Sequence, residues 1–224
     1  MLDKITDTNN VRLVGKVASE KVFSHEMYGE GFYNIDLEVP RLSDSVDLLP
    51  ITVSERLMVD VDLSIGEYII VEGQLRSYNR YIDNGNRLVL TIFAKDIYKP
   101  NEDELAEALR KPNEIYLDGF ICKKPIYRTT PFGREITDIL IAVNRSYNKS
   151  DYIPCISWGR NARFCEKMLV GDHIRLWGRI QSREYHKKLA DGELEKKIAF
   201  EVSISKLEYV ENDNNRLAVC EEEL

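Results

Sequence analysis

The chain has 224 residues, of which 43% are hydrophobic and 31% charged, and its formal net charge is −7. This hydrophobic fraction supports a packed core and argues against disorder, and no apolar run approaches the roughly 20 residues that span a bilayer. The first residues lack a basic stretch followed by an apolar one, which is the pattern of a signal peptide. We therefore expect a cytoplasmic protein with no membrane attachment.

The charge is unevenly distributed along the chain. Residues 1–110 carry 12 Lys and Arg against 20 Asp and Glu, whereas residues 111–210 carry 18 against 13. Residues 211–224 carry 1 against 5. The total charge argues at first against nucleic acid as a ligand, but the basic segment removes that objection for one part of the chain.

The cysteines, histidines and carboxylates give no sign of a metal site or of catalysis. No two of the four cysteines are spaced as Cys-x-x-Cys, and the three histidines are scattered, so neither a metal nor a cofactor is expected. Cys155 lies in an apolar run and is expected to be a small buried hydrophobe. No phosphate-binding loop is present, and Asp138, Asp151 and Asp172 are expected to be dispersed and solvated, so the sequence does not predict an enzyme.

Taken in order, the chain repeats itself once. Gly15 and Gly119 each lie at the centre of an alternating apolar stretch, 104 residues apart. Gly66 and Gly171 open the similar runs GEYIIVEGQLRS and GDHIRLWGRIQS, which are 105 residues apart. Landmarks that recur in one order at one spacing indicate two copies of one domain.

Both copies show a similar order of predicted elements. In the first copy, strands are expected over residues 11–23, 32–39, 46–53, 68–78 and 87–98, with a helical stretch over 55–62. In the second copy, they are expected over residues 115–127, 135–143, 152–158, 173–185 and 196–210, with a helical stretch over 160–168. Five strands with a helix between the third and fourth is the order of the OB-fold, a barrel that often binds oligonucleotides. The predicted fold class is therefore all-β, with two tandem five-stranded OB-fold barrels.

A short linker helix is expected to join the two barrels. Asn101 can cap this helix with Glu104 three residues on, and Leu105, Ala108 and Leu109 would form one apolar face. The expected domains are an N-terminal barrel over residues 1–99, the linker over 100–113, a C-terminal barrel over 114–211 and an acidic tail over 212–224.

The most informative stretch is residues 139–163, where two strand-like runs flank a polar turn. Strand alternation places Tyr152 and Trp158 on one face, and Ile153 and Cys155 on the other. Aromatic residues are interleaved here with arginine and lysine, which is the combination that a surface for single-stranded nucleic acid requires. An ordinary half-buried hairpin with a solvated basic rim is the other interpretation of the same residues.

Most of residues 111–210 closely resembles the bacterial single-stranded DNA-binding protein family. The matching segments are AVNR at residues 142–145, DYIPCISWGRNA at 151–162 and GDHIRLWGRIQSREY at 171–185. The resemblance implies that bases stack on four aromatic side chains, which are Tyr147, Tyr152, Trp158 and Tyr185. Arg160 matches the basic residue that contacts phosphate in the family. The cations expected to meet the DNA backbone are Arg145, Lys149, Arg160, Arg163, Arg183, Lys187 and Lys188.

The resemblance is incomplete in two respects. Glu184 and Val170 stand where the family commonly has lysine, which implies a weaker attraction for the DNA backbone. The first copy shares the skeleton but holds no aromatic residue at the four stacking positions, which fall near Ser43, Leu48, Ser54 and Arg80. We therefore expect a structural or assembly role for the first copy, and DNA binding by the second.

The resemblance implies a nucleoid-associated protein that binds single-stranded DNA without strong sequence preference, in replication, recombination or repair. Most family members carry one OB-fold and form tetramers, so two folds per chain imply a homodimer with four folds. The acidic end at residues 221–224 loosely resembles the family's tip that recruits replication and repair proteins, although a frayed terminus also explains it. The alternative is a primosome-like or recombination adaptor that acts mainly through protein partners and binds DNA weakly.

Overall fold

The structure is a computed structural model that describes residues 8–59, 61, 63–82, 85–188 and 194–211. The first barrel consists of β1 (Asn9–Val17), β2 (Val22–Met27), β3 (Glu30–Pro40), β4 (Val46–Ser54), the 3₁₀ turn η1 (Glu55–Met58), β5 (Tyr68–Ile82) and β6 (Gly85–Tyr98). The second barrel consists of β7 (Asn113–Thr129), β8 (Glu135–Arg145), β9 (Lys149–Trp158), α2 (Gly159–Cys165), β10 (His173–Lys188) and β11 (Leu194–Tyr209). Helix α1 (Glu102–Ala108) lies between them in the chain.

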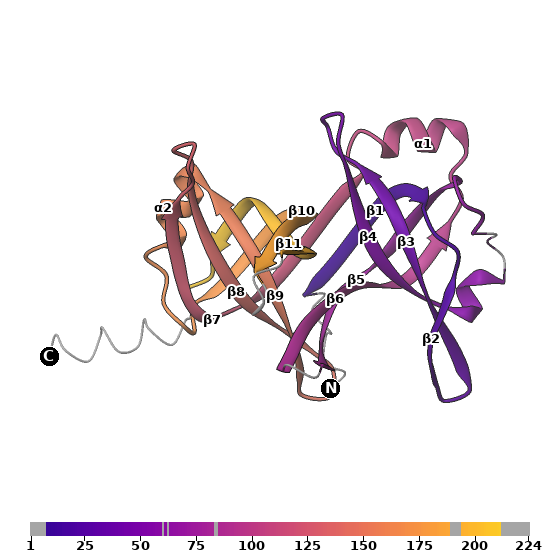
Figure 1. Ribbon diagram of the computed structural model, residues 1–224, viewed down its shortest axis with the longest axis horizontal. Helices are drawn as coiled ribbons and strands as arrows, with labels where there is room; N and C mark the ends of the chain where they lie inside the picture. The colour runs from indigo at the N-terminus through magenta and orange to yellow at the C-terminus, as the bar shows by residue number, and fades with distance from the viewer. Residues whose placement is uncertain (1–7, 60, 62, 83–84, 189–193, 212–224) are drawn as a thin grey trace, which may run out of the picture.

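The strands form one sheet that closes twice. Its order is β10-β11-β9-β8-β7-β1-β5-β6-β4-β3-β2, and additional pairings of β10 with β7 and of β1 with β3 complete the two barrels. Figure 1 shows the first barrel on the right and the second on the left, with β1 and β7 running between them. The predicted all-β class with two tandem OB-fold barrels is confirmed.

The two barrels are joined by backbone hydrogen bonds between β1 and β7. These strands pair antiparallel, with Val11 opposite Ile115, and these two residues are separated by the repeat spacing of 104. Asn9 of the first copy is opposite Leu117 of the second, and the equivalent residues Asn113 and Leu13 are opposite each other with the copies exchanged. This register relates the two copies by an approximate two-fold axis, and the buried side chains of both barrels form one continuous apolar cluster.

Gly73 of β5 and Gly178 of β10 allow the backbone of the neighbouring strand, β6 or β11, to approach closely. A Cβ atom at Gly73 would lie 2.3 Å from the carbonyl oxygen of Phe93, and one at Gly178 would lie 2.2 Å from that of Ser203. The pairing register shifts at both glycines, between Glu72 and Gly73 and at the equivalent position of β10. A β-bulge and a close backbone contact therefore lie at each of these glycines.

The first copy departs from prediction in its first strand and its helix. The stretch expected as one strand over residues 11–23 is divided, because residues 18–21 turn away. Ala18 donates its N–H to the carbonyl oxygen of Asp36, and the Ser19 hydroxyl accepts the N–H of Asp36. Strand β2 then pairs with β3 in a projecting hairpin whose turn holds Tyr28 and Gly29 at positive φ. The predicted helix over residues 55–62 is the single 3₁₀ turn η1.

The linker helix forms where it was expected. Asn101 accepts the N–H of Glu104, and the Glu104 carboxylate accepts the N–H of Asn101, which completes a capping box. Its apolar side packs Ala108 against Val14 and Ile70 on the outside of the first barrel. Among the described helices, none is long and apolar enough to cross a membrane.

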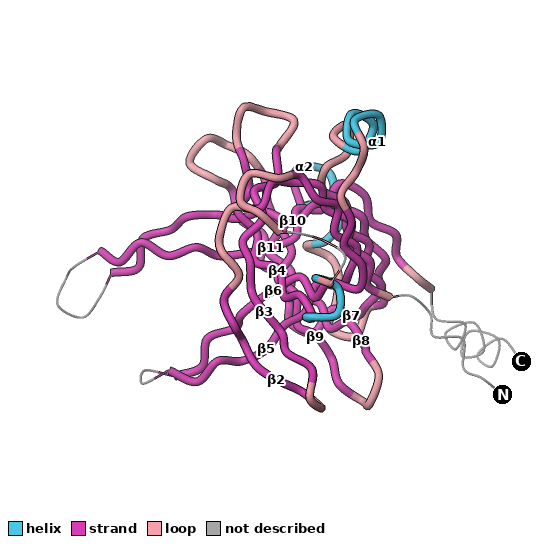
Figure 2. The backbone as a smooth tube through the Cα atoms, turned by 90° about the vertical axis from the view of Figure 1, so that its right-hand side faces the viewer, coloured by secondary structure: helices cyan, strands magenta, loops and turns pink. Residues whose placement is uncertain are grey.

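The long hairpins β5–β6 and β10–β11 reach beyond their barrels. In Figure 2 both extend to the left, from the same side of the molecule, and their tips lie at different heights. Each hairpin consists of the last two strands of its copy, so the two arms are equivalent elements of the repeat.

Candidate nucleic-acid interface

The hairpin of β8 and β9 presents Tyr147 at its tip. The two strands pair from Ile136 opposite Trp158 to Arg145 opposite Lys149, which leaves residues 146–148 as the connecting turn. Tyr147 adopts a φ of 63° and is 93% exposed. Left-handed backbone at a non-glycine residue is typical of tight hairpin turns. The ring therefore stands in solvent and is not part of the core.

Strand β9 carries two further aromatic residues on its outer face. Tyr152 is 46% exposed and Trp158 is 38% exposed, whereas Ile153 and Cys155 between them are buried. The predicted alternation of this strand is confirmed. At the spacing of an extended strand, the six steps from Tyr152 to Trp158 cover about 20 Å. The Trp158 indole donates a hydrogen bond to the hydroxyl of Ser203 at 3.2 Å, which fixes the orientation of its ring.

Tyr185 lies on β10, in the arm of the second barrel, and is 36% exposed. The backbone of Lys187 and Lys188 belongs to the same strand, but their side chains fall outside the described residues. No two of the four aromatic rings are in contact within the described part of the chain. Each ring is therefore a separate position at which a base can stack.

Asp151 anchors the hairpin to the other barrel. Its Oδ1 accepts the N–H of Ser77 at 2.8 Å, and the Ser77 hydroxyl accepts the N–H of Tyr152 at 2.7 Å. Arg76 and Arg145 form ion pairs with the same carboxylate, at 3.1 and 3.4 Å. The expectation that Asp151 is solvated is wrong, because its partners come mainly from a strand 75 residues away in the chain. Burial of a carboxylate requires such partners.

The equivalent residue of the first copy makes the reciprocal contact. Asp47 accepts the N–H of Ser182 at 2.7 Å and pairs with Arg41 and Arg179. Both carboxylates are about 1% exposed at the side chain. Sequence reasoning missed this pair of anchors, although Asp47 and Asp151 are separated by the repeat spacing of 104.

The predicted phosphate-binding cations differ in how much of their charge is available. Three have acidic partners: Arg145 pairs with Asp151, Arg163 with Glu135 and Arg183 with Glu201. Lys149 and Arg160 are exposed and form no ion pair with the part of the chain that the structure describes.

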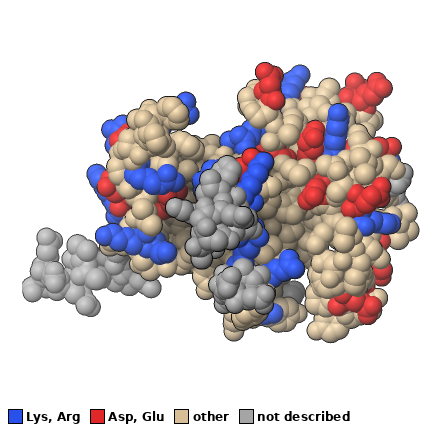
Figure 3. Space-filling view, viewed as in Figure 1, with Lys and Arg blue, Asp and Glu red and all other residues tan. Residues whose placement is uncertain are grey.

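Charge is divided between the two barrels. In Figure 3 most acidic side chains lie on the first barrel, while basic side chains gather along the junction and over the second barrel. The surface around the β8–β9 hairpin is therefore more favourable to an anion than the net charge of −7 suggests.

The described residues offer no metal site, since no group of three or more His, Cys, Asp or Glu side chains is placed to hold an ion there. Cys155 is buried as predicted, and burial raises the pKa of its thiol well above the usual value. A thiol with a raised pKa is a poor nucleophile and a poor metal ligand at neutral pH.

Residues 112–210 match the model of the single-strand binding protein family. The chain is 32% identical over 83 residues to single-stranded DNA-binding protein B of Bacillus subtilis, covering 71% of that protein and 33% of this chain. The chain belongs to this family. The matched residues lie in the second barrel, so this single-strand binding family member carries its family signature in one of its two copies.

Solved structures were compared with the chain as well. The wild-type single-stranded DNA binding protein of Thermus aquaticus has a TM-score of 0.71 at 18% identity, over 91% of this chain and 93% of that chain. This likeness shows that the fold of both barrels together has a counterpart. The N-terminal domain of the PriB protein from Thermoanaerobacter tencongensis is 53% identical, over 42% of this chain and 98% of that chain, with a TM-score of 0.38.

Proposed function

We propose that this protein binds single-stranded DNA without strong sequence preference, and that it does so through the second barrel. The observation that carries the proposal is the set of exposed rings on the β8–β9 hairpin, Tyr147, Tyr152 and Trp158, within the segment that matches the family model. Stacking tolerates any sequence, because every base has a π-face. Tyr185 on the neighbouring arm supplies a fourth ring for the same strand of DNA.

The DNA backbone would be met by the cations around these rings. Lys149 and Arg160 supply the most available charge, because neither is held by an acid among the described residues. The side chains of Arg163 and Arg183 are more than half exposed although each has an acidic partner, so each can also contact a phosphate. Arg145 is already committed to Asp151, so we propose that it mainly supports the hairpin and adds positive charge at its base.

A titration with oligo-dT tests the proposal. Replacement of both β9 rings in Tyr152→Ala/Trp158→Ala removes two stacking positions, and each lost base stack costs roughly 1–3 kcal/mol. The matched control is Tyr28→Ala, which removes a fully exposed tyrosine from the first barrel. The affinity of the wild type should fall with salt, with a slope of about −0.7 for each phosphate that is neutralised. Unchanged affinity in the double variant would rule the proposal out.

Family membership supports a wider context for this binding. We propose that the bound DNA is protected during replication, recombination or repair, and that the protein binds and does not catalyse. We also propose that two chains associate into a homodimer with four OB-folds. Recruitment of protein partners by residues 221–224 remains a proposal from the sequence, because this segment lies outside the described residues.

A further inference from the structure

The first barrel has a groove of about 600 Å³ at the point where it meets the β8–β9 hairpin of the second. Three aromatic residues from three different strands line it, which are His25 of β2, Tyr78 of β5 and Phe93 of β6. Arg76 and Arg145 line the end of the groove that is nearest to the second barrel. Neither the family signature nor the proposed function assigns any role to this groove.

The rings of the groove are held in place from behind. The His25 ring stacks on Phe32, with ring centroids 4.9 Å apart and an angle of 8° between the planes. Phe32 in turn contacts Phe93 at 5.6 Å, and Phe32 is itself buried. Tyr78 is half exposed. Rings that are already ordered lose little conformational entropy when a planar ligand binds to them.

The charge of the groove differs from that of its barrel. Residues 1–110 have more acids than bases, yet no Asp or Glu is among the described residues that line the groove. Arg76 and Arg145 share one carboxylate, that of Asp151, so the pair of guanidinium groups retains a net positive charge. The Nε of Arg145 is buried without a hydrogen-bond partner among the described residues. An anionic ligand fits this environment.

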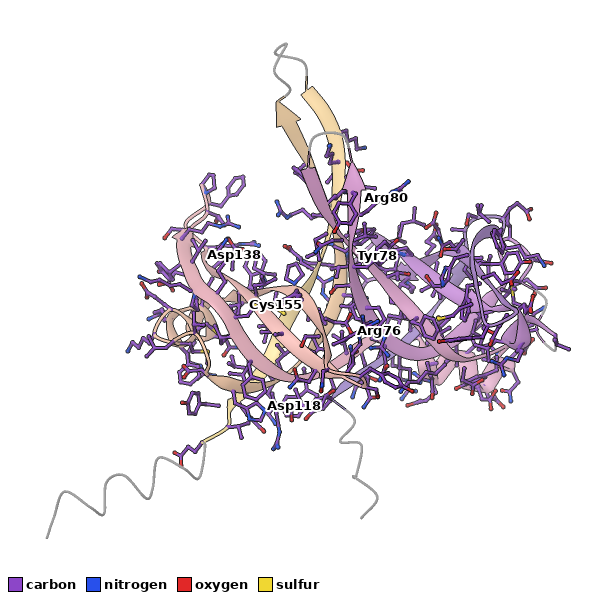
Figure 4. The ribbon with its side chains drawn as sticks, turned by 90° about the horizontal axis from the view of Figure 1, so that it is seen from below. Arg76, Tyr78, Arg80, Asp118, Asp138 and Cys155 are labelled. Atoms are coloured by element: carbon purple, nitrogen blue, oxygen red, sulfur yellow. The ribbon has the colours of Figure 1, made fainter. Side chains whose placement is uncertain are left out.

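The groove continues the surface that carries the exposed tyrosines of the second barrel. Ser77 accepts the N–H of Tyr152, and Tyr78 is the next residue along β5. Figure 4 shows Arg76, Tyr78 and Arg80 in succession along this strand, at the junction of the barrels. The backbone of Tyr152 is therefore in direct contact with Ser77, which lines the groove.

The repeat shows that the first copy has aromatic residues at shifted positions. At the repeat spacing of 105, Tyr78 corresponds to Arg183 and Arg80 corresponds to Tyr185. The two copies thus carry one aromatic and one basic residue on the same part of the fourth strand, in reversed order.

The last strands of the two copies, β6 and β11, also differ in which of them carries an aromatic residue. Phe93 lies opposite Gln74 in the first copy, as Ser203 lies opposite Arg179 in the second. Ser203 is the residue to which the Trp158 indole donates its hydrogen bond. The ring of Phe93 therefore occupies the place that Trp158 covers in the second barrel.

We propose that single-stranded DNA continues from the second barrel onto the first, where its bases stack on Tyr78, Phe93 and His25. The inference rests on the proposed function and extends it to the copy that does not match the family model. Phosphates in this part of the path meet the exposed Arg80, and the net positive charge of the Arg76 and Arg145 pair attracts them.

Oligo-dT of increasing length, with a fluorescent label read by anisotropy, tests the path. The variant Tyr78→Ala/His25→Ala spares Phe93, which packs on Phe32. The control Tyr81→Ala removes an 83% exposed ring from the same strand at a position of opposite parity, and therefore from its other face. We expect short oligonucleotides to bind the variant normally and long ones to bind at least about tenfold more weakly, because two stacking rings are lost. The control should bind every length normally.

The same titration separates this inference from the proposed function. Unchanged affinity of Tyr78→Ala/His25→Ala at every length overturns the inference alone if Tyr152→Ala/Trp158→Ala still weakens binding. If neither variant weakens binding, the proposed function falls together with it. Both tryptophans, Trp158 and Trp177, lie in the second barrel. Quenching of their fluorescence by short oligo-dT should therefore be the same in Tyr78→Ala/His25→Ala as in the wild type. A change in this quenching would show that the substitutions disturb the second barrel, which contradicts a loss of stacking confined to the first barrel.

Photo-crosslinking gives an independent readout on the unmodified chain. A long oligonucleotide with 5-iodouracil at successive positions should crosslink to peptides that contain Tyr78 or Phe93, in addition to those with Tyr152 or Trp158. Crosslinks confined to the second barrel at every position of the label would overturn the inference.

Discussion

At the scale of single residues, two buried carboxylates fix the geometry of the site. Asp151 receives the backbone N–H of Ser77 and lies beside two arginines, so its hairpin cannot move independently of the first barrel. Breaking a buried pair is costly, because the remaining partner loses its compensation in a poorly solvated place. The position of Tyr152, one residue further along β9, is therefore set by a contact between the two copies.

Replacement of Asp151 by asparagine should destabilise the protein. Asparagine keeps the shape of the side chain but removes its charge, which leaves Arg76 and Arg145 uncompensated. We expect a loss of about 3 kcal/mol in the free energy of unfolding, measured by urea denaturation at pH 7. The control is Asp138→Asn, which breaks the exposed pair with Arg128 and should cost no more than about 1 kcal/mol. Equal effects of the two substitutions would contradict the anchoring role.

At the scale of elements, local patterns predicted most of the fold. The alternation in β9 placed Tyr152 and Trp158 outward, and the Asn101 and Glu104 pair identified the start of α1. Both signals depend on residues that are close together in the sequence. The division of β1 from β2 depends on hydrogen bonds between residues 18–19 and Asp36, which no local pattern reveals.

In the candidate site too, local patterns predicted some features, whereas contacts between residues far apart in the sequence were missed. Exposed rings were identified from their spacing and from the family resemblance, but the anchoring of the hairpin by Asp151 was not. Its partner Ser77 lies in the other copy, 74 residues away in the chain, so no local pattern points to the contact. The groove of the first barrel was missed for a related reason. Tyr78 and Phe93 do not occupy the positions at which the family stacks bases, and only the folded barrels bring them together.

A carboxylate that joins β7 to β10 should make stability depend on pH. Burial alone would raise the pKa of Asp118, but hydrogen bonds from His173 and Arg175 outweigh it, so the pKa lies below its usual value of 3.8. A group with a lowered folded pKa stabilises above its unfolded pKa, and this contribution is lost as the pH falls through the folded value. We expect Asp118→Asn to be less stable than the wild type at pH 7 by urea denaturation, and this difference to shrink as the pH falls below about 3.8.

The exposed pair of Arg128 and Asp138 again provides the comparison. Both of its side chains are well exposed, so Asp138→Asn should change stability little at any pH. A difference between Asp118→Asn and the wild type that persists undiminished at low pH would show that the packing of this side chain, and not its charge, stabilises the strands.

At the scale of the whole molecule, one chain already contains a two-fold pair of barrels. The strands β5, β1, β7 and β10 lie side by side across the axis and form a continuous outer face. On this face Trp177 packs against Tyr116 at 5.1 Å, beside a shallow groove of about 490 Å³ that Arg12 and Glu72 also line. Trp, Tyr and Arg are the residue types that most often dominate protein interfaces. This face is therefore the part of the molecule to which we assign the proposed homodimer.

Light scattering on the purified chain tests this assignment. The wild type should have twice the chain mass of 26.0 kDa, and Trp177→Glu should shift the mass toward that of one chain, because it places an unpaired charge in the proposed interface. The control Tyr28→Glu adds the same charge at the exposed β2–β3 turn and should leave the mass unchanged. A wild type that has the mass of one chain at micromolar concentration would contradict the homodimer. A Trp177→Glu variant that still has the mass of two chains would show that the dimer interface lies on another face of the molecule.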